Sequence, residues 1–366
     1  MTETEHRADP QPDEALRFVR ASVANQCNLS CVYCPKDAGM ENHVPATLRG
    51  QRLSTPAYQR VLAALADTGV LGGISFTGGE PTLNPDLPVL VAQARRRYRR
   101  VELTTNGRKL PEQLDRLAPH LDVIKVSLDS HDRELSHQIM RGRPEDHDRA
   151  LDAIRRSLAA GLTVGVNVVV MRRNLNQIAP IIRTVADLRA SAGAGTAYVS
   201  LLDLYYTPST RTLWQQEFVA LDALSERLAA ELGDGVEQHR KGCVIRWFNH
   251  GGVQIRVKDS HESTFRGARC QGCATYCQEG FYGLKLSVEG WLTPCPSGAE
   301  HLGVHLPTNL SDEALRERIA PLAQELAATT LAAGSFGDFL VRNDLHIDGT
   351  ARRTQLPLTV LPGGRR

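Results

Sequence analysis

The chain has 366 residues, enough for one large α/β domain and a smaller module, and its 42% hydrophobic content is that of an ordinary globular protein. Its 43 lysines and arginines against 41 aspartates and glutamates leave a formal charge of +2, which argues against nucleic acid or a membrane as main partner and favours a small-molecule substrate. Residues 1–15 are polar and carry no apolar segment, so we expect a disordered leader on a cytoplasmic protein.

From residue 16 to about residue 235, short β-branched runs alternate with amphipathic stretches whose apolar residues recur at helical spacing. The predicted strands are RFVRASVA, GGISFT, RRVELTT, DVIKVSLD, LTVGVNVVV and AYVSLL, and the helices that follow them include PAYQRVLAALADTG, LPEQLDRLAP and NQIAPIIRTVADLRA. Six such units in series predict an α/β fold with a parallel sheet. Six rather than eight units favour a partial (β/α)6 TIM-like barrel, with the active site at the C-terminal ends of its strands.

After Leu232 this alternation stops, and GDGVEQHRKG is interpreted as a linker. We expect residues 236–310 to form a cysteine-rich module and residues 311–366 a helical segment with a tail.

The segment ANQCNLSCVYCPKD follows the first predicted strand and holds three of the eight cysteines, Cys27, Cys31 and Cys34, in a C-x3-C-x2-C spacing. Clustered thiols in a reducing compartment indicate a metal site more often than disulfides. A structural zinc site uses four protein ligands, whereas three thiolates suit a 4Fe-4S cluster with one iron open to a non-protein ligand. The alternatives to a cluster site are that these three cysteines are buried small residues or form half of a zinc knuckle.

With Tyr33 before the last cysteine and TGGEP at Thr77–Pro81, the sequence resembles the radical S-adenosylmethionine (SAM) superfamily. FTGGEPTLNPDL, LTTNG, VSLDS and TVGVNVVVMRRNLNQI resemble its GTP 3′,8-cyclase branch. This resemblance implies an enzyme whose cluster binds SAM, takes one electron from a donor such as flavodoxin or ferredoxin, and forms a 5′-deoxyadenosyl radical that abstracts a hydrogen atom.

The glycine pair Gly78 and Gly79 is expected to let the backbone approach a ligand closely, and Glu80 to accept from the SAM ammonium. The resemblance implies that Asn106 and Ser127 lie near the SAM carboxylate and ribose, and Asn167 near the ribose or the substrate.

A second cysteine group, Cys270, Cys273, Cys277 and Cys295, has the spacing C-x2-C-x3-C-x17-C. Alternating GLKLSVEGWLTP predicts a hairpin turning at Glu289–Gly290 that returns the last thiol toward the others. Four thiols suit a structural zinc site, and this alternative stays open on spacing alone. The resemblance to twitch and SPASM modules implies a second, auxiliary 4Fe-4S cluster instead.

The sequence also departs from the cyclase pattern, which has three auxiliary cysteines followed by an arginine-containing run. This chain has a fourth cysteine in the group, and Lys285 stands where an arginine is expected. Cys243 is left over, and three roles stay open for it. It is a cluster ligand in place of Cys273 or Cys277, a hydrogen-atom donor to a substrate radical, or a buried small side chain. Asp129 is a further candidate, with helix capping as its simpler role.

We therefore expect a radical SAM enzyme that abstracts a hydrogen atom from a small polar metabolite. A composition rich in Ala, Arg, Leu and Gly suggests an actinomycete-like source, and hence a sugar-nucleoside or aminosugar in antibiotic biosynthesis, modified by decarboxylation, epimerisation, dehydrogenation or carbon–carbon coupling. A peptide-modifying enzyme, a divergent GTP 3′,8-cyclase and a non-catalytic metal-binding protein are the alternatives. Candidate substrate contacts after the sixth strand are Asp203, Tyr205, Tyr206 and Arg211.

Overall fold

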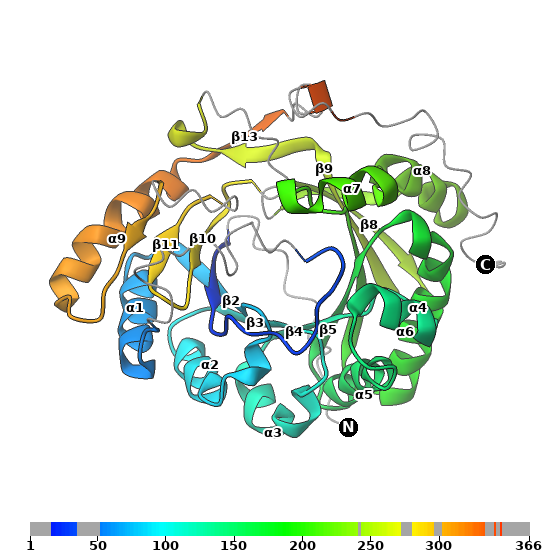
Figure 1. Ribbon diagram of the computed structural model, residues 1–366, viewed down its shortest axis with the longest axis horizontal. Helices are drawn as coiled ribbons and strands as arrows, with labels where there is room; N and C mark the ends of the chain where they lie inside the picture. The colour runs from blue at the N-terminus through cyan, green and yellow to red at the C-terminus, as the bar shows by residue number, and fades with distance from the viewer. Residues whose placement is uncertain are drawn as a thin grey trace, which may run out of the picture.

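The computed structural model describes residues 16–34, 52–240, 243–271, 280–295, 302–333, 340–341 and 345. Six parallel strands lie side by side in sequence order, which confirms the predicted strand–helix series. They are β1 (Arg17–Ser22), β2 (Leu71–Thr77), β3 (Arg100–Thr105), β4 (Val123–Ser127), β5 (Thr163–Val169) and β6 (Thr196–Leu202). Figure 1 shows helices along the outside of this curved sheet, as in a partial barrel.

The helices begin and end where the sequence supplies caps and breakers. They are α1 (Thr55–Asp67), α2 (Leu87–Arg95), α3 (Leu114–Leu117), α4 (Arg133–Met140), α5 (Asp146–Ala159), α6 (Ile178–Ala192), α7 (Arg211–Glu217) and α8 (Leu221–Leu232). Ser54 caps α1 by accepting from the backbone N–H of Ala57. The predicted helix LPEQLDRLAP is only partly α-helical, because Pro111 and Pro119 fall in the 3₁₀ turns Leu110–Glu112 and Ala118–His120 on either side of α3.

Residues 236–240 of the predicted linker after α8 form a strand, and this part of the prediction was wrong. β7 (Val236–Arg240), β8 (Cys243–His250) and β9 (Val253–Arg266) form an antiparallel ribbon, and β9 adds to β6 in parallel. Gly251 and Gly252, both at positive φ, make the two-residue turn between β8 and β9. The sheet therefore continues past the sixth predicted unit.

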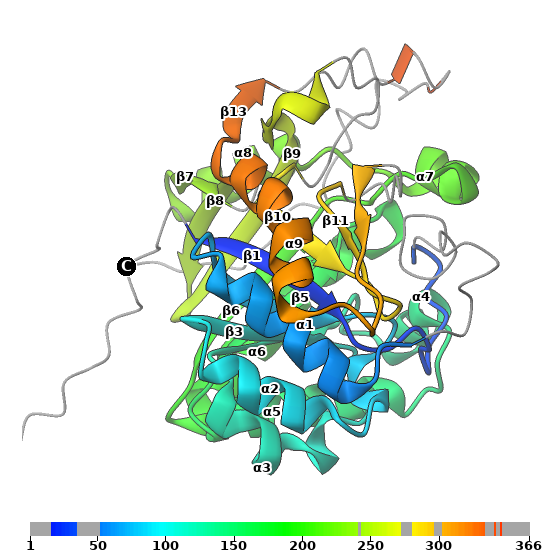
Figure 2. The ribbon, with the colours of Figure 1, turned by 90° about the vertical axis from the view of Figure 1, so that its left-hand side faces the viewer.

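The other edge of the barrel is completed by the C-terminal part of the chain, next to α1 (Figure 2). β10 (Gly283–Leu286) pairs in parallel with β1, and β11 (Trp291–Thr293) and β12 (Val304–His305) follow antiparallel. Gly290, at φ +93°, forms the turn between β10 and β11, which confirms the predicted hairpin. α9 (Asp312–Ala327) packs on α1, and β13 (Thr330–Ala333) pairs with β9.

The two faces of the barrel wall differ in polarity. Ile74, Phe76, Leu103 and Val166 are fully buried in one apolar core that the surrounding helices cover. Because side chains alternate along a strand, the intervening residues face the inside of the barrel. No helix among the described residues is long and apolar enough to cross a membrane.

Candidate active site

The three clustered cysteines lie on one loop that begins where β1 ends, and we call residues 23–34 the cysteine loop. Cys27 is exposed, and Cys31 and Cys34 are half-buried. Burial raises the pKa of the Cys31 thiol, and the charges of Asp129, Cys34 and Cys27 raise it further. Among the described residues, no group of three or more His, Cys, Asp or Glu side chains is arranged to bind a single metal ion. In a 4Fe-4S cluster, by contrast, each thiolate binds a different iron, and three neighbouring thiols on one loop fit that group.

The glycine pair after β2 allows the cysteine loop to lie directly against it. The N–H of Gly79 donates to the Ala24 carbonyl at 2.7 Å, and the N–H of Glu80 donates to the Gln26 carbonyl at 2.8 Å. A Cβ at Gly78 would lie 2.3 Å from the Ala24 oxygen, and one at Gly79 would lie 2.3 Å from the Gln26 oxygen. The close approach predicted here is thus made by the cysteine loop itself.

Glu80 connects the ends of β2 and β3. Its carboxylate is 1% exposed; one oxygen accepts from the N–H and hydroxyl of Thr82 and from the Thr105 hydroxyl, and the other accepts from the N–H of Asn106 at 2.8 Å. Burial raises the pKa of Glu80, and these hydrogen bonds oppose that shift. The second oxygen keeps acceptor capacity for one more donor, which leaves the SAM ammonium role as a prediction.

A second set of contacts fixes the middle of the cysteine loop. The Asn106 amide donates to the Asn28 side-chain oxygen at 2.7 Å, and Arg108 donates to the Asn28 carbonyl at 3.1 Å. Arg108 also forms an ion pair with Asp146 of α5 at 2.8 Å. Asn106 therefore positions the loop, and its predicted contact with SAM stays a prediction.

The end of α4 holds the loop on its other side. The N–H groups of Ser30 and Val32 donate to the carbonyls of Met140 and Ile139 at 3.2 and 2.9 Å. The next residue, Arg141, is the only described non-glycine residue at positive φ (50°), a conformation that ends the helix and turns the chain away. The helix end is thus shaped to pair with the cysteine loop.

Tyr33 joins the cysteine loop to a buried carboxylate. Its hydroxyl donates to Oδ2 of Asp129 at 2.6 Å, and Oδ1 of Asp129 accepts from the N–H of Val169 at 2.8 Å. Burial raises the pKa of Asp129 to about 6. Asp129 does not cap α4, since Asp132 does so by accepting from Leu135. The simpler role considered for Asp129 was therefore wrong.

Ser127 and Asn167 lie side by side at the C-terminal ends of β4 and β5, where the strands are paired in register. Both are half-buried, and the N–H of Leu128 donates to the Asn167 carbonyl at 3.0 Å. They share the barrel edge from which the cysteine loop departs. This placement is compatible with their predicted positions near SAM or substrate.

The inner face of the barrel is polar and carries more basic than acidic groups. Glu102, fully buried, forms ion pairs with Lys125 and with Arg100. Arg256 donates to the Ser200 hydroxyl at 3.0 Å and lies over the Tyr198 ring. The inward-facing cationic residues by strand register are Arg20, Arg100, Lys125, Arg256, Lys258 and Lys285. A barrel interior filled by packing would instead carry layers of branched apolar side chains.

The second cysteine group is described only in part. Cys270 ends the 3₁₀ turn Ala268–Cys270 and is half-buried, and Cys295 follows β11 and is half-buried. Arg269 forms an ion pair with Glu325 of α9, which fixes the segment that carries Cys270. Cys273 and Cys277 lie outside the described residues, and Cys243 is the first residue of β8.

One contact links this C-terminal region to the cysteine loop. The Asn25 amide donates to Oε1 of Glu289, which is 5% exposed at the turn between β10 and β11. The hairpin that leads to Cys295 therefore touches the loop that holds Cys27. Sequence reasoning missed this contact, as well as the contacts made by Asn28 and Arg108, because none belongs to a recognisable motif.

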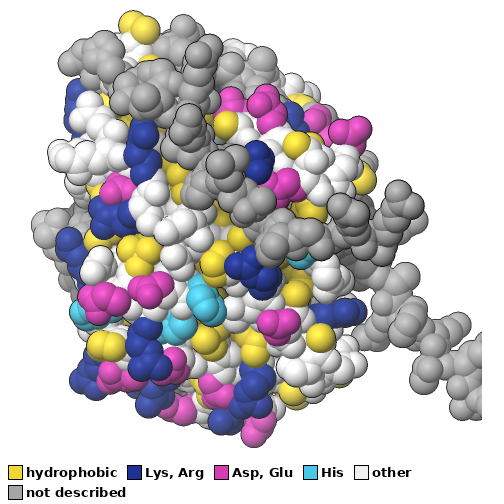
Figure 3. Space-filling model, turned by 90° about the vertical axis from the view of Figure 1, so that its right-hand side faces the viewer, with side chains coloured by type: hydrophobic (Ala, Val, Ile, Leu, Met, Phe, Trp, Pro, Cys, Tyr) yellow, Lys and Arg dark blue, Asp and Glu magenta, His cyan; other side chains and the backbone are white. Residues whose placement is uncertain are grey.

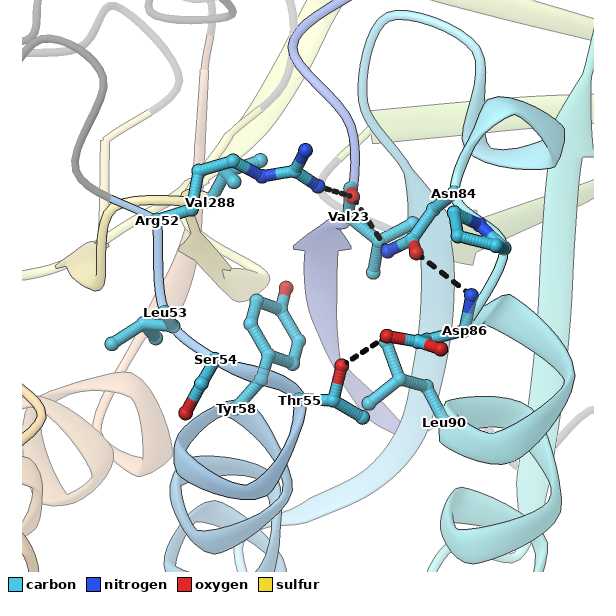
Figure 4. A pocket seen from close by; sticks show the side chains of 11 residues that line it. Val23, Arg52, Leu53, Ser54, Thr55, Tyr58, Asn84, Asp86, Leu90 and Val288 are labelled. Carbon is cyan, nitrogen blue, oxygen red and sulfur yellow. Dashed lines mark hydrogen bonds between the residues drawn. The ribbon is translucent and has the colours of Figure 1, made fainter.

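A cavity of about 290 Å³ lies between the starts of α1 and α2, on the helix side of β1 and β2 (Figure 4). Arg52 and Asn84 both donate to the Val23 carbonyl, at 3.4 and 2.9 Å, and Thr55 donates to Asp86 at 2.6 Å. The polar groups here hold the start of the cysteine loop from outside the barrel.

On the face that Figure 3 shows, basic and acidic side chains are interspersed without a large area of one sign. Of the candidate substrate contacts, Tyr206 packs edge-on against Trp214, with ring centroids 5.7 Å apart, and thus has a packing role.

These features define a class of protein. Residues 21–185 match the family model described as the radical SAM superfamily, and this range includes the cysteine loop, the glycine pair and the ends of β3, β4 and β5. The match identifies residues 21–185 as a radical SAM domain, and such a domain indicates an enzyme with a 4Fe-4S cluster and SAM as cofactors.

Its curated relatives include GTP 3′,8-cyclases. The chain is 35% identical over 177 residues to the probable GTP 3′,8-cyclase of Methanopyrus kandleri, covering 47% of this chain and 54% of that protein. It is 28% identical over 302 residues to the GTP 3′,8-cyclase of Heliobacterium modesticaldum, covering 80% of this chain and 84% of that one. With the Chlorobaculum tepidum enzyme it is 40% identical across 45% of that protein. The match thus spans about half the length of the Methanopyrus and Chlorobaculum relatives.

The fold is also similar to that of Streptococcus suis SuiB bound to S-adenosylmethionine. The TM-score is 0.53 at 14% identity, with 86% of this chain and 66% of SuiB covered. At this identity the likeness shows the fold alone.

Proposed function

We propose that the protein abstracts a hydrogen atom from a small polar, anionic metabolite bound inside the barrel. This proposal rests on one observation. The cysteine loop lies at the C-terminal edge of a barrel whose inner face is polar and cationic. A site for an anion needs such groups, because a charge is stable away from water only when it is paired and hydrogen-bonded.

Cys27, Cys31 and Cys34 would hold three irons of the SAM-binding cluster. When bound, this cluster supplies the electron that cleaves SAM into methionine and a 5′-deoxyadenosyl radical. Glu80 would orient the SAM ammonium through its second oxygen, and Gly79 fixes the cysteine loop beside it. An external one-electron donor such as flavodoxin or ferredoxin would reduce the cluster.

For the substrate, the relatives named GTP 3′,8-cyclase make GTP the first compound to test, and a divergent cyclase the leading candidate. The basic residues of the inner face support a phosphorylated substrate. A sugar-nucleoside or aminosugar stays the second candidate, because the auxiliary group has one cysteine more than the cyclase pattern.

For the C-terminal part we propose an auxiliary 4Fe-4S cluster held by Cys270, Cys273, Cys277 and Cys295, in a module of residues 236–310. Four thiolates would occupy every iron, so this cluster would serve electron transfer or structure rather than substrate binding. The half-buried positions of Cys270 and Cys295 support this proposal.

The test begins with anaerobic iron and sulfide analysis of the purified protein. We expect roughly eight irons per chain for two clusters and roughly four for one. Dithionite and SAM should then yield 5′-deoxyadenosine, and the true substrate should increase its rate while being consumed. GTP, guanosine and an aminosugar nucleoside are compared at equal concentration. Zinc without iron, or no deoxyadenosine from a fully loaded protein, would contradict the proposal.

A further inference from the structure

Asp129 is a fully buried carboxylate whose described partners are both uncharged. Its two oxygens accept from the Tyr33 hydroxyl and the Val169 N–H, and no described cation pairs with it. Asn174 donates to the Asp129 carbonyl at 2.8 Å and to the Val169 carbonyl at 2.9 Å. The carboxylate is therefore held in one place between the ends of β4 and β5.

An ionised side chain in this environment costs stability, since burial removes its hydration and two neutral hydrogen bonds do not replace a counter-ion. The hydrogen-bond geometry itself does not require a charge. An asparagine could accept from the Val169 N–H with its oxygen and donate its amide to the Tyr33 hydroxyl, which can accept as well as donate. The fold alone therefore does not explain why position 129 carries an ionisable side chain rather than an asparagine.

The position of the carboxylate suggests what the charge does. Tyr33 stands between Cys31 and Cys34 in the chain, and its hydroxyl is 2.6 Å from Asp129. Tyr33, Cys31 and Val32 all pack on one apolar cluster with Ile139 and Met171. In such surroundings the effective dielectric constant is lower than in water, so a fixed charge acts strongly on its neighbours.

We propose that Asp129 is a positioning and tuning residue, which lowers the reduction potential of the cluster held by the cysteine loop by keeping a negative charge beside it. Reduction adds one electron from a flavodoxin- or ferredoxin-type donor, without bonds being made or broken, and a neighbouring negative charge opposes that addition. The potentials of iron–sulfur clusters depend on such charge and solvent exposure. A lower potential makes the reduced cluster a stronger reductant toward SAM. This inference rests on the proposed cluster site.

The test compares the wild type with Asp129→Asn, in which the side chain keeps its size and loses its charge. The matched control is Asp132→Asn, three residues away, because Asp132 is exposed and asparagine is an equally good helix cap. Each reconstituted protein is titrated potentiometrically, and the electron paramagnetic resonance signal that SAM addition changes is followed, which separates this cluster from the auxiliary one.

We expect a more positive midpoint potential for Asp129→Asn, a larger reduced fraction at a fixed dithionite concentration, and wild-type behaviour for Asp132→Asn. An unchanged potential in Asp129→Asn, or an equal shift in the control, would overturn the inference. If Asp129→Asn retains no iron, the midpoint potential and the reduced fraction are measured on Asp129→Ser instead. The same shift is expected there, and an unchanged potential would overturn the inference. A wild-type protein without a SAM-responsive signal would instead overturn the proposed cluster site itself.

Discussion

Replacing Gly79 by alanine tests whether the cysteine loop depends on close backbone contact. The added Cβ would lie 2.3 Å from the Gln26 oxygen, 2.6 Å from the Gln26 carbonyl carbon and 2.9 Å from the Asn25 oxygen, whereas ordinary contact begins near 3.4 Å. All three atoms are backbone, so no side-chain rotation relieves the overlap. The loop has to move by about 1 Å.

Such a movement weakens the hydrogen bonds from Gly79 to Ala24 and from Glu80 to Gln26, which are 2.7 and 2.8 Å long. Each is worth about 1 kcal/mol net, and overpacking adds about 1–3 kcal/mol. We therefore expect a loss of about 3–5 kcal/mol in the free energy of unfolding, out of about 5–15 kcal/mol for a typical domain.

The assay measures urea unfolding of the apo-protein, then iron retained and 5′-deoxyadenosine formed after reconstitution. The control is Gly72→Ala at the other end of β2, where the three atoms nearest to an added Cβ belong to the flexible side chains of Leu16 and Arg99. Its expected cost is below about 1 kcal/mol. Wild-type stability and iron content in Gly79→Ala would refute the role given to this contact.

Three other predictions follow from the site. Cys31→Ala should abolish deoxyadenosine formation and keep about half of the iron, because the two proposed clusters have separate ligands; continued SAM cleavage would contradict the assignment. Glu102→Gln leaves Lys125 buried without its counter-charge and should lower the free energy of unfolding by about 3–5 kcal/mol in urea titrations, whereas a change below about 1 kcal/mol would show that the pair is dispensable. Cys243→Ala should keep the full iron content; a loss of substrate turnover with SAM cleavage retained would make Cys243 a hydrogen donor, and a loss of iron would make it a ligand.

The strands and helices of the barrel could be predicted because periodicity and capping act locally. In β2 and β5 the apolar residues that mark the strand are also the ones buried under the helices. The ribbon β7–β9 was missed because the polar sequence GDGVEQHRKG carries no apolar alternation; the Gly251–Gly252 pair was the available signal for its hairpin.

The placement of Cys27, Cys31 and Cys34 on one loop after β1 was predictable, because a local motif contains all three. The roles of the surrounding residues depend on distance in space. Nothing in the sequence says that Asn28 lies against Asn106, or that Asp129 meets Tyr33, because each pair joins segments at least 78 residues apart. Glu80 was recognised, but the sequence could not show that four protein donors already surround it.

The pairing of β10 with β1 has a consequence for the order of events during synthesis. β1 is made first and β10 emerges only about 260 residues later, so on the ribosome β1 remains a sheet edge with one side unpaired. The Asn25–Glu289 hydrogen bond likewise waits for the hairpin after β10. Domains generally fold as units during synthesis, and here the unit closes only when its last strands arrive. Delivery of iron and sulfide to the proposed cluster site would therefore come after about four-fifths of the chain has left the ribosome.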